Sequence, residues 1–253
     1  MVLLVRPRLE EPTDPIEIVV LHEDALVLAV DKPAGLPMHP TATYHRYTLT
    51  FALRERYGAG APHIAHRLDR ETSGVVLCGK TVDAERSLKR AFEARQVKKT
   101  YLAIVRGRLD AHEGVVDVPL GRAIEGLHVL MRVDPEAGGL PARTRYRVIE
   151  RAQHTSLLSL EPETGRQHQL RVHLASIGHP IVGDKLYGPD GVEPFLEHIE
   201  TGMTDALRMR LGHDRHALHA HEVRFAHPAT GAPTTITSAL PADLRGLWAE
   251  VSR

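Results

Sequence analysis

Several features are scarce in this sequence of 253 residues, and each scarcity excludes a class of protein. The single cysteine, Cys78, excludes an intramolecular disulfide, and its place in the apolar run 75–78 is typical of a buried thiol. No apolar stretch approaches the ~20 residues of a membrane helix, and the first residues lack the core and cleavage site of a secretory signal. We therefore expect a cytoplasmic protein that does not enter a membrane.

An excess of charge of one sign is also lacking. Lysine plus arginine and aspartate plus glutamate number 32 each, and the formal net charge of +0 gives no global attraction to a polyanion. Lysine is scarce beside arginine, whose planar guanidinium suits phosphate, but arginine-rich usage alone does not identify a partner. Any surface that binds nucleic acid must therefore be local.

Hydrophobic residues make up 42% of the chain, enough to bury a substantial core. Three prolines and mixed charge predict a loose N-terminal arm in 1–15, and residues 16–253 then form one domain. Helical spacing predicts helices at 48–57, 81–95, 167–177 and 241–251, and 188–215 resembles a polar, glycine-containing insertion. Apolar runs predict two strands in 16–30 around a turn at Glu23-Asp24, and others at 75–79, 100–105, 128–133, 144–149, 156–160 and 222–225. The predicted class is α+β, with a large mixed, mainly antiparallel sheet flanked by helices and loops.

The segment AHRLDRETSG, residues 65–74, combines ionisable and turn residues directly before an apolar strand. One interpretation is a loop that presents the carboxylate of Asp69. The simpler alternative is a charged surface turn, in which Asp69 caps the backbone near Thr72 or Ser73 and Arg67 is solvated. The segment alone favours the surface turn.

The segment ETGRQHQLRVH, residues 163–173, places Arg166 at the mouth of a predicted helix and Arg171 on the same face as Gln167. Its alternative is an amphipathic helix with a solvated polar face. His168 and His173 lack the i, i+4 spacing of a helical zinc site, so the sequence predicts no metal here.

The segment KKTYLAIVRG, residues 98–107, alternates so that Tyr101, Ala103 and Val105 share one face of a strand. A tyrosine in the core is the alternative to a functional tyrosine at this position.

Taken together, these segments closely resemble the RluA-type family of pseudouridine synthases. The matching motifs are DKPAGL, HRLDRETSG, KKTYLAIVRG, GRQHQLRVH, GHPIVGDKLYG and HALHAHEVRFAHPATG, and they occur in the family's order from about residue 16 to 228. Gln167 departs from the family, which usually has a small hydroxyl residue there. Many relatives also carry a small N-terminal RNA-binding domain that residues 1–15 cannot form, so we expect the catalytic domain itself to hold the RNA.

The resemblance implies that Asp69 is the essential carboxylate, which either attacks the sugar or base or abstracts a sugar proton. It also implies that Arg166 forms an ion pair with Asp69 and keeps it ionised. Tyr101 matches the family's active-site tyrosine, which can stack on uracil with its hydroxyl near the C5 proton. The expected substrate-binding residues are Arg67, His66, Lys98, Lys99, His168 and Arg171, and Lys32 and Arg70 are further candidates for phosphate contacts.

The resemblance implies a substrate of structured RNA, either ribosomal or transfer RNA, and an enzyme that works without a cofactor or metal. The oligomeric state is open, and a monomer is our default expectation. A uridine inside a stem must leave the base stack before it can reach Asp69. Loops and bulges are therefore the easier targets.

Two other functions compete with this prediction. A metal-dependent hydrolase is suggested by His216, His219 and His221, because His219 and His221 would share a strand face, although no H-E-x-x-H pattern occurs. The other is an RNA-binding module or chaperone that has lost catalysis, against which the joint presence of Asp69, Tyr101 and Arg166 argues.

Overall fold

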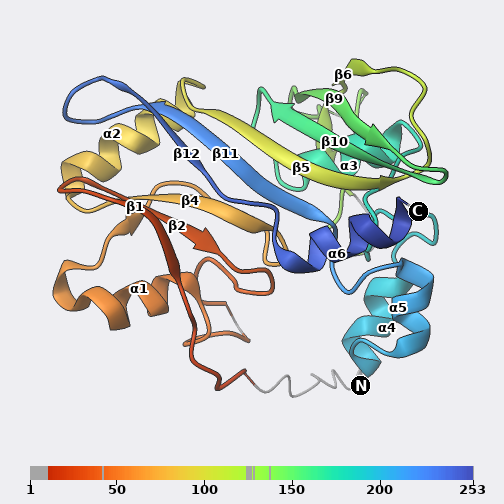
Figure 1. Ribbon diagram of the computed structural model, residues 1–253, viewed down its shortest axis with the longest axis horizontal. Coiled ribbons are helices and arrows are strands. Elements are labelled where there is room, and N and C mark those ends of the chain that lie inside the picture. Colours follow the sequence, from red (N-terminus) through yellow and green to blue (C-terminus); the bar gives the residue numbers. More distant parts are fainter. Residues whose placement is uncertain (1–10, 42, 124–126, 128, 137, 253) are drawn as a thin grey trace.

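The computed structural model describes residues 11–252 except 42, 124–126, 128 and 137, and it is built around one large twisted sheet (Figure 1). Among these residues the sheet has ten strands, eight of them in the order β1-β2-β4-β11-β5-β10-β9-β6, with β12 paired to β11 and β3 to β4. A separate two-stranded sheet joins β7 and β8. The strands are β1 (Val19–Glu23), β2 (Val27–Lys32), β3 (His63–Ile64), β4 (Ser73–Gly79), β5 (Lys98–Arg106), β6 (Glu113–Asp117), β7 (Leu120–Arg122), β8 (Met131–Val133), β9 (Arg143–Arg151), β10 (Thr155–Pro162), β11 (Leu218–Ala226) and β12 (Pro233–Thr237).

Six α-helices surround this sheet in the described part of the chain. They are α1 (Leu49–Tyr57), α2 (Val82–Glu93), α3 (Gln169–Ser176), α4 (Glu193–Thr201), α5 (Asp205–Leu211) and α6 (Ala242–Val251). α1 and α2 begin as their sequences predict, because the hydroxyls of Thr48 and Thr81 accept hydrogen bonds from backbone amides of the first turn. No helix in the described ranges is long and apolar enough to cross a membrane.

Strand β4 is the centre of the fold. All seven of its residues are buried, which explains why its sequence is a continuous apolar run instead of an alternating one. It pairs antiparallel with β2 and parallel with β11, so the sheet is mixed but mainly antiparallel. Alternation in β2 sends Val27 and Ala29 to the cluster under α2, and Leu28 and Val30 to the cluster that includes α1. The predicted α+β class is thus confirmed.

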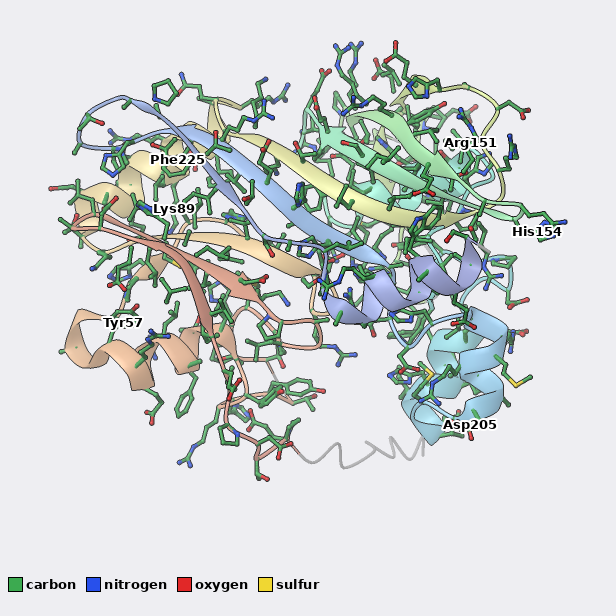
Figure 2. All side chains as sticks on the ribbon, viewed as in Figure 1. Tyr57, Lys89, Arg151, His154, Asp205 and Phe225 are labelled. Carbon is green, nitrogen blue, oxygen red and sulfur yellow. The ribbon has the colours of Figure 1, made fainter. Side chains whose placement is uncertain are left out.

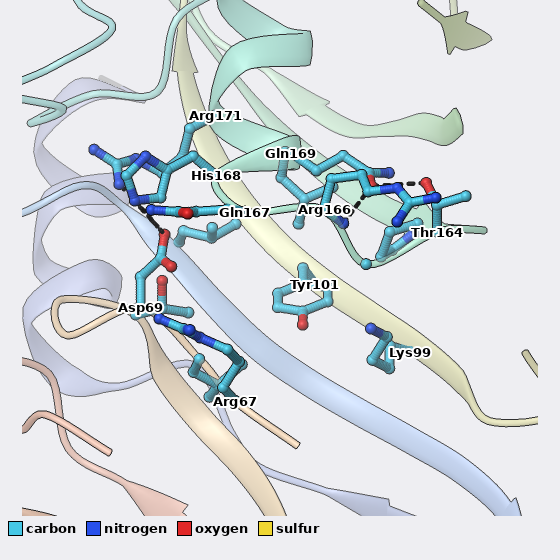
Figure 3. A pocket seen from close by; sticks show the side chains of 16 residues that line it. Arg67, Asp69, Lys99, Tyr101, Thr164, Arg166, Gln167, His168, Gln169 and Arg171 are labelled. Atoms are coloured by element: carbon cyan, nitrogen blue, oxygen red, sulfur yellow. Dashed lines mark hydrogen bonds and ion pairs between the residues drawn. The ribbon is translucent and has the colours of Figure 1, made fainter. Parts of the chain in front are cut away.

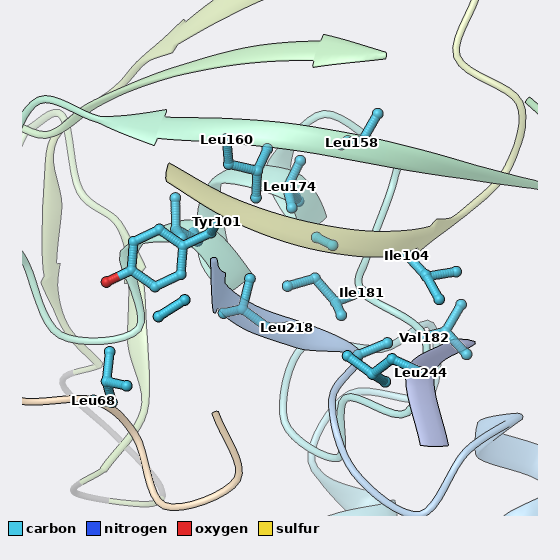
Figure 4. Close-up of a cluster of buried hydrophobic side chains, with 14 of the residues drawn as sticks. Leu68, Tyr101, Ile104, Leu158, Leu160, Leu174, Ile181, Val182, Leu218 and Leu244 are labelled. Carbon is cyan, nitrogen blue, oxygen red and sulfur yellow. The ribbon is translucent and has the colours of Figure 1, made fainter. Parts of the chain in front are cut away.

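The larger hydrophobic cluster includes the side chain of Tyr101 on β5. Figure 4 shows leucines and isoleucines from several elements packed along β5, with the Tyr101 ring at one end and its hydroxyl pointing away from them. The cluster includes Ile104, Leu158, Leu174 and Leu218, all at most 9% exposed. The same strand therefore anchors the core and positions one wall of the site described below.

The secondary structure differs from the sequence prediction in several regions, among them strands β3, β6, β7 and β12, which were not predicted. Segment 188–215, expected to be a polar, glycine-containing insertion, contains α4 and α5, two short helices that were not predicted. Arg210 joins them by contacting carboxylates of Asp190, Glu193 and Glu197 at 2.9–3.4 Å. The strand expected at 128–133 is shorter in the structure, where β8 spans only Met131–Val133. Position 128 lies outside the described residues.

The periphery of the molecule is polar, as Figure 2 shows for Lys89 on α2 and Asp205 on α5. Of the predicted arm, 1–10 lies outside the described residues. Glu11 contacts the domain, because its carboxylate accepts hydrogen bonds from the backbone amides of His45 and Arg46, both at 2.6 Å.

Gly74 gives a direct test of how tightly β4 and β11 must approach. Its φ is +115°, and a Cβ atom there would overlap the carbonyl oxygen of Ala220. We expect Gly74→Ala to destabilise the protein by about 2–5 kcal/mol and to lower Tm by about 5–15 °C, through backbone strain and overpacking. Gly246→Ala in α6 is the matched control: no atom lies within 4 Å of the new methyl group, so it should raise stability by about 0.5–1 kcal/mol. Thermal melts of both variants test this, and equal melting temperatures would contradict it.

Candidate active site

Asp69 lies in the loop between β3 and β4, and buried polar groups hold this loop from behind. The ammonium group of Lys32 is completely buried and donates to the carbonyl oxygens of Pro33, Leu36 and Arg70 at 2.8, 2.9 and 3.0 Å. Burial, together with the charge of Arg215, lowers the pKa of Lys32 to about 7. The suggested phosphate contact through Lys32 is therefore wrong, because its position and hydrogen bonds commit it to the loop.

A second network fixes the residues that follow Asp69. The carboxylate of Glu71 accepts a hydrogen bond from Lys185 at 2.8 Å, and Lys185 also donates to the carbonyl of Asp214. The ring of His216 hydrogen-bonds the hydroxyl of Thr72 at 2.8 Å. These bonds join the Asp69 loop to two segments that are more than a hundred residues away in the sequence.

In front of the loop, one buried arginine contacts two carboxylates. Arg171 on α3 donates to Asp184 through Nε at 2.7 Å and Nη2 at 2.8 Å, a bidentate pair, and its Nη1 lies 3.3 Å from Oδ2 of Asp69. The Asp184 side chain is fully buried and the Arg171 side chain is only 7% exposed. Figure 3 shows Arg171 above Asp69, with a dashed line to the carboxylate. A planar guanidinium can satisfy both partners at once, whereas a lysine ammonium cannot match this fork.

His168 is the second neighbour of Asp69. Its Nε2 lies 3.9 Å from Asp69 Oδ2, and its Nδ1 hydrogen-bonds the hydroxyl of Tyr187 at 2.7 Å. Its φ is +54°, a left-handed backbone conformation that costs a non-glycine residue about 1–3 kcal/mol. Tyr187 also stacks its ring against the guanidinium of Arg171 at 5.0 Å. Tyr187 therefore orients both residues that face Asp69.

The electrostatic balance keeps Asp69 ionised. Burial alone would raise the pKa of Asp69, but His168, whose ring is charged only at acid pH, and the charge and hydrogen bond of Arg171 outweigh it, so the pKa lies below its ordinary value. Burial lowers the pKa of His168 to about 4, which leaves this ring neutral near pH 7. Arg171 is thus the permanent cation beside Asp69.

The predicted ion pair between Asp69 and Arg166 is wrong. Arg166 lies before the first turn of α3, where its Nε donates to the carbonyl of Pro141 at 3.3 Å. In Figure 3 Tyr101 is drawn between Asp69 and the group formed by Arg166, Thr164 and Lys99. Arg171, two residues into the helix, points across to the Asp69 loop instead. The pairing is thus made by the second arginine of the GRQHQLR motif and not by the first.

Buried Gln169 holds the backbone around Arg166 in place. Its Oε1 accepts from the Thr164 hydroxyl at 2.7 Å and the Arg166 amide at 3.0 Å, and its Nε2 donates to the carbonyl of Arg143 and the hydroxyl of Thr144. All hydrogen-bonding positions of the amide are therefore used. The unusual Gln167 is exposed and leaves this network undisturbed.

Tyr101 forms a wall of the same pocket and is 7% exposed. Burial, with a contribution from the charge of Asp69, raises the pKa of Tyr101 well above its ordinary value. Its hydroxyl is therefore protonated at neutral pH and can donate a hydrogen bond.

These residues enclose a cavity of about 290 Å³. Asp69, Tyr101, His168 and Arg171 line it, with Arg67, Lys99 and Arg166 also present. The structure thus brings together most of the residues that the sequence singled out. His66 and Lys98 line an adjacent groove instead, and Nε2 of His66 accepts a hydrogen bond from the amide of Leu77. Arg70 lines neither cavity and donates to the hydroxyl of Tyr44.

The histidines that suggested a metal site serve other purposes. His219 hydrogen-bonds Ser73 and the carbonyl of Ser238, and His221 hydrogen-bonds the same carbonyl at 2.7 Å. His216 contacts Thr72, as described above. Within the described part of the chain, no group of three or more histidine, cysteine, aspartate or glutamate side chains could hold a metal ion.

From the sequence, no role was predicted for Asp184 or Tyr187, although both lie in the motif GHPIVGDKLYG that resembles the family. The only sequence pattern that could have pointed to them was this motif. Asp184 contacts Asp69 through Arg171, and Tyr187 contacts it through His168, so neither relation is visible in sequence spacing.

The chain is similar to known proteins over most of its length. The model of the RNA pseudouridylate synthase family matches residues 26–176. Three similar bacterial proteins are each named ribosomal large subunit pseudouridine synthase D. The one from Nitrosomonas europaea is 40% identical over 90% of this chain, and the chain spans 63% of its length. Those from Xanthomonas campestris and Zymomonas mobilis are 41% and 36% identical, over 90% and 97% of this chain and 67% and 76% of their own.

Two solved human structures are similar over most of the chain. RNA pseudouridylate synthase domain containing 1 has a TM-score of 0.71 at 27% identity, covering 90% of this chain and 86% of its own. RNA pseudouridylate synthase domain containing 4 has a TM-score of 0.74 at 26% identity, covering 92% of both chains. The chain therefore belongs to the RNA pseudouridylate synthase family.

Proposed function

We propose that this protein isomerises uridine to pseudouridine in structured RNA, with Asp69 as the catalytic carboxylate. The observation that carries the proposal is an ionised aspartate at a pocket of about 290 Å³, held by a buried arginine and faced by a tyrosine. A cavity of this size suits one extruded base. Large-subunit ribosomal RNA is our first candidate target, because several relatives are named for it, and transfer RNA is the second.

The reaction has simple requirements. The N1–C1′ bond breaks, a C5–C1′ bond forms, C5 loses a proton and N1 gains one, with no net oxidation or reduction. The residues needed are therefore a carboxylate that attacks the nucleotide or abstracts a sugar proton, a group that keeps this carboxylate charged, and a wall that holds the uracil while it turns.

Asp69 fits the first requirement under either route. Arg171 fulfils the second, because it offsets the effect of burial on the carboxylate and cannot lose its own proton at neutral pH. Two hydrogen bonds from Arg171, through Nε and Nη2, are made to Asp184. Because they are independent of Asp69, the guanidinium keeps its orientation when a substrate enters the pocket.

Tyr101 fits the third requirement. Its ring can stack on the extruded uracil, and stacking of this kind contributes about 1–3 kcal/mol per base. Because its pKa is raised, its neutral hydroxyl serves as a donor, and it acts as a base only if another group takes its proton. A uridine in a loop or bulge reaches this pocket more easily than one in a stem, because less stacking is lost. We propose that the enzyme works in the cytoplasm as a monomer.

The alternative is an RNA-binding module without catalysis. The conformational strain at His168 and the burial of two charged residues beside Asp69 argue for a working site, because both are costly features that binding alone would not need.

Replacement of Asp69 separates catalysis from binding. Asp69→Asn removes the charge without changing the shape of the side chain, so we expect loss of pseudouridine with RNA binding largely kept. Pseudouridine mapping by carbodiimide-dependent primer stops, in cells with the gene intact, deleted or restored as Asp69→Asn, tests this. A stop lost on deletion and restored by Asp69→Asn would sink the assignment of Asp69, and no lost stop at all would favour the binding module.

Replacement of Asp184 tests the role of the buried ion pair. Asp184→Asn should leave Arg171 less well oriented and reduce kcat about 10- to 100-fold. Because the pKa of Asp69 is lowered in the native protein, its active ionised form persists until the pH falls well into the acid range. With Arg171 misplaced the pKa of Asp69 rises, and the acid limb of the rate profile should move toward neutral pH.

Single-turnover rates as a function of pH, with a melting curve to confirm folding, measure this effect. A slower variant with an unshifted acid limb would show that Asp184 is only structural.

A further inference from the structure

A second cavity, which we call the lateral groove, adjoins the proposed active site. It has a volume of about 1040 Å³. The C-terminal end of α2 and the start of β5 form one side, and the start of β9 and the end of β10 form the other. The two cavities adjoin each other and share six lining residues: Arg67, Lys99, Pro162, Thr164, Gly165 and Arg166. A strand whose base enters the pocket can therefore continue along this groove.

The lateral groove is strongly basic in a protein of zero net charge. Seven lysines and arginines line it against three glutamates, an excess of four positive charges. Glu163 is already engaged by Arg145 at 2.6 Å and by Arg143 at 3.6 Å. Within the described residues, no carboxylate lies within 4.0 Å of five of the basic side chains: Arg67, Arg95, Lys98, Lys99 and Arg166. In the described part of the chain these cations therefore have no carboxylate partner.

Lys99 stands at the junction of the two cavities. It is partly buried, and this burial lowers its pKa. Its Nζ lies 3.7 Å from the position that a Cβ atom of residue 165 would occupy, so the glycine there leaves the ammonium group open to the groove. A partly buried cation with no carboxylate beside it among the described residues is less favourable than a fully solvated one, and an incoming phosphate would supply a charge partner.

Aromatic surface accompanies these charges. The rings of Phe92 and His66 lie 4.5 Å apart, and Lys99 Nζ lies 5.8 Å from the Phe92 centroid. Burial lowers the pKa of His66 to about 3, so its ring is neutral and adds no repulsion. Cations along a groove with aromatic rings between them are the combination that binds unpaired nucleic acid strands.

We propose that the lateral groove binds the unpaired RNA strand that adjoins the flipped uridine. Arg67, Lys99 and Arg166 take the phosphates at the junction, and Arg95 and Lys98 take those further along the strand. A cavity of this volume holds a few nucleotides of single strand and not a double helix. This inference rests on the proposed function, since it assumes that the pocket receives a base from RNA.

Binding experiments on the inactive Asp69→Asn protein test the groove independently of turnover. The probes are a labelled 12-nucleotide oligouridylate and a labelled RNA stem-loop with uridines in its loop. In this background, Arg95→Gln/Lys98→Gln removes two groove charges that do not line the catalytic pocket. The matched control, Arg54→Gln/Arg245→Gln, removes two exposed charges from α1 and α6, outside both cavities.

Fluorescence anisotropy over a salt series should show weaker binding of both RNAs by the groove variant. The slope of log K against log salt should fall by about 1.4, because each contact with a single strand contributes about 0.7. In the active protein the same groove substitutions should raise KM for RNA. The control should keep both the affinity and the slope of its parent.

Three results would overturn the proposal: unchanged affinity and slope in the groove variant, an equal loss in the control, or no measurable binding of either RNA by the parent. Displacement of oligouridylate by an equally long polyglutamate peptide at equal concentration would overturn it too, in favour of an acidic protein partner. Failure of the proposed function is distinguishable, because it would appear as absence of pseudouridine in cells while the groove variant still bound RNA more weakly than its parent.

Discussion

The guanidinium of Arg171 satisfies two carboxylates at once, and the proposed chemistry depends on this sharing. A buried arginine paired only with Asp184 would be a structural ion pair of uncertain net value, since desolvation offsets most of the attraction. A buried Asp69 without Arg171 would tend to take up a proton and lose its charge. The shared geometry makes one desolvated cation serve both purposes: Asp184 fixes the guanidinium, and the guanidinium keeps Asp69 ionised. The left-handed His168 and its bond to Tyr187 complete this frame.

Much of the fold was predictable from the sequence because its central elements follow simple patterns. The fully buried strand β4 is an unbroken apolar run, and α2 presents a clear apolar stripe behind a threonine cap. The helices α4 and α5 were missed because the glycine and polar residues around them indicate an insertion, although α4 itself has an apolar face, and the contacts of Arg210 that link them are tertiary. Propensity and spacing do not report contacts of that kind.

The site shows the same division. The residues of the pocket were identified from motifs, yet the partner of Asp69 was assigned to the wrong arginine. Sequence order places Arg166 and Arg171 in one motif, but only the helical turn between them decides which side chain faces the loop. The burial of Lys32 was equally invisible, because a lysine beside a proline and glycine gives no indication that carbonyl groups will surround it. Relations between residues that meet only through the tertiary fold could not be deduced locally.

The position of β11 has a consequence for how the protein is made. This strand is inserted between β4 and β5, although it follows both by more than a hundred residues in the sequence. During synthesis the chain therefore carries two unpaired strand edges until residues 218–226 leave the ribosome. Open edges of this kind are prone to pair with other chains. The segment that closes the sheet also delivers His216 and His219 to the back of the Asp69 loop, so the catalytic centre can form only after almost the whole chain has emerged.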